Sequence, residues 1–180
     1  GADNTLTTER AMATDALTPG KSWGVHLSNG NKRGFWAASL AREDDPNNNY
    51  MHSAPVGLST RLVWYPINTD QQTVHLGISG SLRDFNGNAF RIAERAELDT
   101  GSRVVRSAAF AADSAVLVGL EGIWQRGPLL IQAEYLTAGV DETTGPTWRY
   151  NGYYITGSYF LTGENHRLRD GSLRRVKLAG

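Results

Sequence analysis

Alternation of apolar and polar residues over residues 114–161 is the feature that most restricts how this chain can fold. Three runs carry the pattern: Ser114–Gln125, Pro128–Val140 and Trp148–Leu161. In the first run Val118 and the other alternate apolar residues share one parity, and Glu121 falls on the other. A period of two is typical of a strand with two different faces. Because a tight Gly-Pro turn and a longer polar turn join the runs, the sequence predicts an antiparallel meander.

Shorter runs earlier in the chain follow the same pattern. Turn sequences rich in Asn, Gly and Asp separate them, and Asp44–Pro55 and Asp99–Ala112 are long enough to be loops. The count comes to about eight strands, which predicts an all-β, antiparallel up-and-down fold. The earlier runs are Trp23–Ser28, Phe35–Arg42, Leu58–Ile67, Thr73–Phe85 and the weakly patterned Phe90–Leu98.

Bulk composition excludes several classes of protein. The 180 residues suit one domain, and a formal net charge of zero does not point to nucleic acid. The absence of Cys excludes disulfides and thiolate metal sites. No segment approaches the ~20 consecutive apolar residues of a membrane helix. The mean hydropathy of −0.39 fits a soluble protein. It fits a membrane barrel equally well, because alternate residues of a barrel face a polar lumen.

The catalytic and metal-binding motifs that the sequence approaches are all incomplete. A phosphate loop ending at Lys21 would need Gly six residues earlier, where Asp15 stands. Residues 77–81 lack the final Gly of a serine elbow. Glu121 and Glu134 could act as an acid–base pair only inside a cleft, and pairing with inward Arg is the simpler interpretation. The sequence predicts no enzyme, no cofactor and no metal site; the histidines are too scattered for a zinc motif, at His26, His52, His75 and His166.

Several segments resemble one known family. GPLLIQAEYL, followed by YNGYYITGSYFLTGE, resembles the signature of the phosphate- and polyphosphate-selective porins, the porin O/P family. ERAMATDALTPGKSWGVHLS, LSTRLVWYPIN and TVHLGISGSLRDF resemble earlier segments of that family in the same order. The likeness covers most of the chain, from about Glu9 to Gly171.

The resemblance implies a fold, a place and an activity. It implies a transmembrane β-barrel of porin type in the outer membrane of a Gram-negative cell, without cofactor. It also implies a homotrimer that lets small anions such as phosphate or polyphosphate diffuse passively. In the family the constriction is the work of basic residues on an inward-folded loop, and no position of this chain matches that loop.

Residues of the polar parity are expected to line the lumen. Arg suits this role, because its planar fork of donors matches phosphate-like oxyanions, and the chain has fifteen Arg but only three Lys. An Arg-rich surface and pairing with wall carboxylates such as Asp84 and Glu94 are the competing interpretations. The predicted anion pathway consists of Arg61, His75, Arg83, Arg91 and Arg95. The other lumen candidates are His26, Ser28, Ser79, Ser81, Glu121, Gln132, Glu134, Thr156 and Ser158.

Aromatic residues near the predicted strand ends suggest the girdles of a membrane barrel. Ordinary core packing in a soluble barrel is the alternative. The residues concerned are Trp23, Trp36, Trp64, Trp124, Trp148, Tyr150 and Tyr153.

The strand count conflicts with a whole channel. Barrels with an aqueous channel have roughly sixteen to eighteen strands, whereas eight leave room only for side chains or one small ligand. We therefore expect residues 1–180 to be a single β-barrel domain that is an interior part of a larger porin. The alternative is a small soluble or periplasmic β-barrel that binds a small ligand in its mouth.

Overall fold

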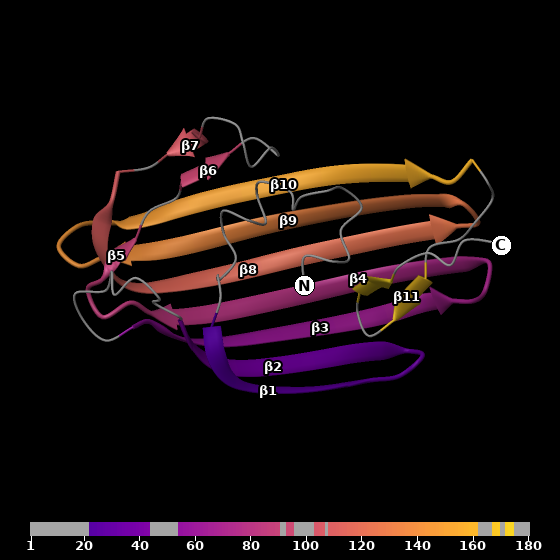
Figure 1. Ribbon diagram of the computed structural model, residues 1–180, viewed down its shortest axis with the longest axis horizontal. Helices are drawn as coiled ribbons and strands as arrows, with labels where there is room; N and C mark the ends of the chain where they lie inside the picture. Colours follow the sequence, from indigo (N-terminus) through magenta and orange to yellow (C-terminus); the bar gives the residue numbers. More distant parts are fainter. Residues whose placement is uncertain are drawn as a thin grey trace.

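The computed structural model describes residues 22–43, 54–90, 93–95, 103–106, 108–161, 167–169 and 172–174. Its main element is an eight-stranded antiparallel sheet in the order β1-β2-β3-β4-β8-β9-β10, with β5 paired to β8 (Figure 1). This architecture confirms the prediction of an all-β, up-and-down fold. The strands are β1 (Ser22–Gly30), β2 (Gly34–Glu43), β3 (Val56–Asn68), β4 (Gln72–Asp84), β5 (Ala89–Phe90), β8 (Phe110–Arg126), β9 (Leu129–Glu142) and β10 (Thr147–Tyr159).

Two small hairpins stand apart from the main sheet. β6 (Ala93–Arg95) pairs with β7 (Arg103–Arg106), and β11 (Arg167–Arg169) pairs with β12 (Ser172–Arg174). Among the described residues, no helix is long and apolar enough to cross a membrane.

The prediction that Phe90–Leu98 is a strand of the sheet is wrong. β4 pairs directly with β8, from Gln72 opposite Arg126 to Asp84 opposite Ser114. Within the predicted segment, Phe90 belongs to the two-residue β5, and β6 pairs only with β7. The sequence signal is weak in this segment, because Glu94 interrupts the parity that carries Phe90 and Ile92, and charged residues occupy most of the other parity.

The turns confirm most of the predicted connections. Asn86 and Gly87 both have positive φ, of 51° and 73°. Two consecutive residues with positive φ are typical of the tight turns that Asn-Gly sequences favour. Gly127 also has positive φ, at 55°, and begins the turn between β8 and β9. The first hairpin turns slightly later than predicted, because Asn31 Oδ1 accepts hydrogen bonds from the backbone N–H groups of Arg33 and Gly34.

The ladders contain two irregularities, and the second explains why β8 begins earlier than predicted. The register of β3 with β4 shifts between Trp64 and Ile67, where Pro66 has no N–H to contribute to the ladder. The register of β8 with β9 shifts between Ala112 and Ser114. Since such a shift changes the parity of the residues before it, the alternation that begins at Ser114 could not show that β8 starts at Phe110.

The sheet is open, with β1 and β10 at its edges, and its two faces differ in exposure. We call the more buried one the inner face; it carries His75, Ser79, Glu121, Glu134, Thr156 and Ser158, all of them buried or half-buried. The opposite, outer face carries Leu76, Ile78, Val118, Leu120, Ile131, Ile155 and Tyr159, all exposed. Both sets face as the alternation predicted. The inner face differs from the prediction in one respect: it also buries apolar side chains, including Leu130, Leu136 and Val140.

Rows of cross-strand partners make the outer face a band. The middle row runs across six strands, through Trp36, Leu62, Ile78, Leu120, Tyr135 and Tyr153, and every one of these side chains is exposed. The rows at both margins of the band contain polar residues. One row contains Arg42, Asp84, Ser114, Asp141 and Thr147 together with Val56, and the other contains Gln72 and Arg126 together with Leu129 and Tyr159.

An aromatic cluster closes the inner face at the end where β4 leaves the sheet. Phe85, which is 4% exposed, packs edge-to-face against Phe90 with ring centroids 5.5 Å apart. Phe90 also lies 5.6 Å from Phe110 and 6.1 Å from Tyr150, measured between centroids. Phe110 reaches Trp148 at 6.2 Å. The cluster thus ties β5 and the start of β8 to β10, across the inner face of β9.

Candidate functional site

Two of the predicted pathway residues meet on one carboxylate of the inner face. Arg61 on β3 donates from Nε and Nη2 to Oε1 of Glu121 on β8, over 2.9 and 2.6 Å. His75 Nε2 on β4 lies 2.9 Å from the same oxygen. A single carboxylate oxygen therefore joins side chains from three adjacent strands. We refer to Arg61, His75 and Glu121 as the inner triad.

Glycine makes this arrangement possible. Gly77 is the cross-strand partner of Glu121, and the carboxylate lies over it on the way to β3. A Cβ built on Gly77 would overlap the Glu121 side chain. Glu134, on β9, is the other cross-strand partner of Glu121. Like charges directly opposite one another are destabilising, so extension of Glu121 toward Arg61 also separates the two carboxylates.

His75 is the fixed part of the inner triad. Its side chain is completely buried, and its ring packs edge-to-face against Tyr65 with centroids 5.5 Å apart. The contact from Nε2 to a carboxylate assigns the proton to Nε2. Nδ1 is buried with no hydrogen-bond partner among the described residues. His75 therefore reaches the inner space only through Glu121.

The third basic residue of the predicted pathway is placed away from the inner triad. Arg83 lies nearer the aromatic cluster, with its guanidinium carbon 4.9 Å from the centroid of the Phe85 ring, a cation–π contact. Arg91 lies outside the described residues, and Arg95 is described only as part of the β6 backbone. A role of these five residues in an anion pathway stays a prediction.

Neutral polar side chains fill the inner face beside the inner triad. Ser59 and Ser81 join through their hydroxyls over 3.0 Å, between β3 and β4. Gln132 Nε2 donates to the Tyr154 hydroxyl over 2.7 Å, between β9 and β10. Such groups can offer brief hydrogen bonds to a hydrated ion without the cost of releasing it from a tight site.

The predicted aromatic girdle stays a prediction for the residues that lie on the outer face. Trp23, Trp36, Trp64 and Tyr153 are exposed there, but Trp36 and Tyr153 belong to the middle row and not to a margin. The prediction is wrong for Trp148 and Tyr150, because their rings join the aromatic cluster of the inner face. Trp148 Nε1 also donates to Glu142 Oε2 over 2.9 Å. Parity could have shown this, since both residues share it with Thr156.

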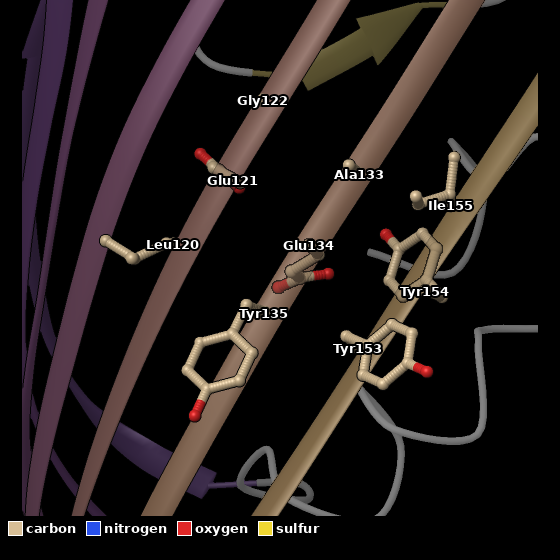
Figure 2. Close-up of a pocket in the computed structure, with 9 residues that line it drawn as sticks. All are labelled: Leu120, Glu121, Gly122, Ala133, Glu134, Tyr135, Tyr153, Tyr154 and Ile155. Carbon is tan, nitrogen blue, oxygen red and sulfur yellow. The ribbon is translucent and has the colours of Figure 1, made fainter.

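A shallow hollow of about 340 Å³ lies over β8, β9 and β10 (Figure 2). Its floor contains the paired small residues Gly122 and Ala133, which belong to the outer face. Leu120, Tyr135 and Ile155 border it. Glu121 and Glu134 also line the hollow, but no basic side chain does, so it offers no positive charge to an anion.

Metal chemistry finds no support in the part of the chain that the structure describes. There, no group of three or more His, Asp or Glu side chains is arranged to hold a metal ion.

Sequence reasoning missed how the inner triad is assembled. It placed Arg61, His75 and Glu121 on the polar face, but it counted Phe90–Leu98 as a strand between those of His75 and Glu121, which in fact pair directly. The usable signal was Gly77, because a glycine inside a strand often marks the close approach of another group.

A family model and a curated relative agree on one family of proteins. A family model described as "Phosphate-selective porin O and P" matches residues 1–179. Porin O of Pseudomonas aeruginosa is 30% identical to this chain in a region that covers 61% of the chain. The same region spans 30% of the length of Porin O.

Proposed function

Because the chain belongs to the family of phosphate-selective porins O and P, we propose that it forms part of the wall of a Gram-negative outer-membrane channel for small anions. The family points to a channel rather than an enzyme. Phosphate-like oxyanions are the proposed solutes, and the expected homotrimer remains a prediction.

The observation that carries this proposal is the difference between the two faces. On β4 the outer residues from Val74 to Leu82 are uncharged, and the polar residues Gln72 and Asp84 flank them. At ~3.4 Å per residue that stretch is about 27 Å long, or about 21 Å across a bilayer at a tilt of roughly 40°. This is close to the ~25 Å apolar band of outer-membrane barrels.

A soluble barrel explains the outer face less well. Soluble monomers rarely expose contiguous apolar patches larger than a few hundred Å². Here exposed Leu, Ile and Trp side chains continue across β1 to β10. On the inner face, Arg83 supplies positive charge, Arg61 is paired with Glu121, and serine, glutamine and tyrosine groups supply hydrogen bonds. Conduction needs weak, repeated contacts of this kind.

Reconstitution of the complete polypeptide that carries this sequence tests the proposal. The protein should need detergent to stay in solution and should form ion-conducting channels in planar bilayers. In a KCl gradient, the reversal potential should show that chloride permeates more readily than potassium. A protein that stays monodisperse without detergent and gives no conductance would favour the soluble alternative.

A further inference from the structure

The guanidinium of Arg61 has the geometry of an oxyanion-binding site, and the carboxylate of Glu121 occupies that site. A guanidinium presents two parallel N–H groups that bind carboxylate and phosphate alike. In the inner triad both donors, Nε and Nη2, go to Oε1 of Glu121. The carboxylate of the chain therefore stands where the oxygen of a passing anion would bind.

We propose that Glu121 is a specificity-determining residue of the channel, because it masks a phosphate-binding site at Arg61. The inference rests on the proposed function and deepens it. While Glu121 is bound to Arg61, the guanidinium contributes little net charge to the pathway and its paired N–H donors are occupied. When Glu121 does not cover it, Arg61 binds phosphate and slows its passage. Glu121 thereby sets the strength of oxyanion binding at this point of the wall.

The exposed fractions of the three side chains show that an ion can reach the Arg61–Glu121 pair and that His75 holds Glu121 in position. The side chains of Arg61 and Glu121 are 30% and 21% exposed, so an ion in the inner space can approach both. His75 is completely buried on the other side of the same oxygen, 2.9 Å away. Its ring cannot follow a moving carboxylate and so favours the position in which Glu121 covers Arg61.

Two substitutions of Glu121 unmask Arg61 in different ways. Glu121→Gln removes the charge that holds the guanidinium. Glu121→Asp keeps the charge but shortens the side chain, which must cross β4 above Gly77 to reach β3. The aspartate variant therefore separates masking from the simple change in wall charge. Glu134→Gln is the matched control, because Glu134 is the cross-strand partner of Glu121 and its loss removes the same charge.

The measurement is phosphate inhibition of the chloride current through the complete porin in planar bilayers. The half-inhibiting concentration of inorganic phosphate should fall about tenfold in Glu121→Gln, as expected for one added charge-assisted bond. Glu121→Asp should lower it in the same direction. Arg61→Gln alone should leave it nearly unchanged, and adding Arg61→Gln to Glu121→Gln should restore the wild-type value. If Glu134→Gln lowers the half-inhibiting concentration at all, adding Arg61→Gln should not reverse that effect.

The outcomes distinguish this inference from the proposed function. A wild-type protein without channels would refute the function itself. Channels in which phosphate inhibits wild type and both Glu121 variants equally would overturn the mask alone. An equal gain in Glu121→Gln with and without Arg61 would also overturn it, because the effect would then come from wall charge. If Glu121→Gln does not insert, the aspartate variant decides the question.

Discussion

Gly77 and Glu121 face each other across the β4–β8 ladder, and the carboxylate of Glu121 folds over the glycine to reach Arg61 on β3. The inner triad therefore depends on the absence of a side chain at Gly77 as well as on its own charged groups. A polar network on a sheet needs space above the backbone as well as partners at the right distance.

Gly77→Ala should destabilise the protein by about 1–3 kcal/mol, the usual cost of forcing a side chain into occupied space. A urea titration, followed by the gel mobility of folded and unfolded forms, measures the change. Gly80→Ala on the same strand is the control, because its Cβ would lie 3.6 Å from Thr60 Oγ1, an ordinary contact. Equal midpoints for the two variants would contradict the crossing of Glu121 over Gly77.

Neighbouring residues of β10 should differ in their access to water. The sequence has no Cys, so single cysteines can be introduced one at a time. In the bilayer, Thr156→Cys on the inner face should react with a charged, water-soluble thiol reagent, whereas Ile155→Cys on the outer face should not. Mass spectrometry after labelling gives the extent of reaction. The reverse order would show that the strand is shifted by one residue.

A charged side chain on the outer face should destabilise the protein more in the middle row than near a margin row. Ile78→Arg, in the middle row, should lose about 2–4 kcal/mol of stability in lipid, and Leu82→Arg, next to the polar margin row, about 0–1 kcal/mol. Both positions are exposed and lie on β4, which makes them matched. Unfolding from lipid vesicles in denaturant measures the two values. Equal costs would mean that the band does not face lipid.

Phe85→Ala should destabilise the protein by about 3–5 kcal/mol, because Phe85 is almost fully buried in the aromatic cluster. Leu161→Ala, at a position that is 94% exposed, should change stability little. Denaturant unfolding compares the two, and a small effect of Phe85→Ala would place the cluster outside the stable core.

Replacing Arg83, Arg91 and Arg95 together with Gln should lower the anion-to-cation permeability ratio. The effect should be clearest at low salt, where screening is weak. The reversal potential in a KCl gradient measures it, with the wild-type channel as reference. An unchanged potential would indicate that these arginines are paired within the wall.

Alternation alone was enough to predict the facing of β4, β8, β9 and β10, because a strand with one exposed and one enclosed face must alternate. It failed for Phe90–Leu98, where charges on both parities weaken this signal. It also could not bring Arg61 and His75 to Glu121. Parity gives the face of a residue, but its partners depend on register, and the register of β4 with β8 is set across residues 85–109.

The segment of residues 85–109 also determines the order in which the strands of the sheet assemble. Closing residues 85–109 costs about 2 kcal/mol more chain entropy than closing the turn at 69–71, so hairpins on either side are favoured first. β1–β4 and β8–β10 would then form as separate units and join last at β4 and β8. The inner triad and the aromatic cluster both cross this junction. Loss of either should therefore accelerate unfolding more than it slows folding.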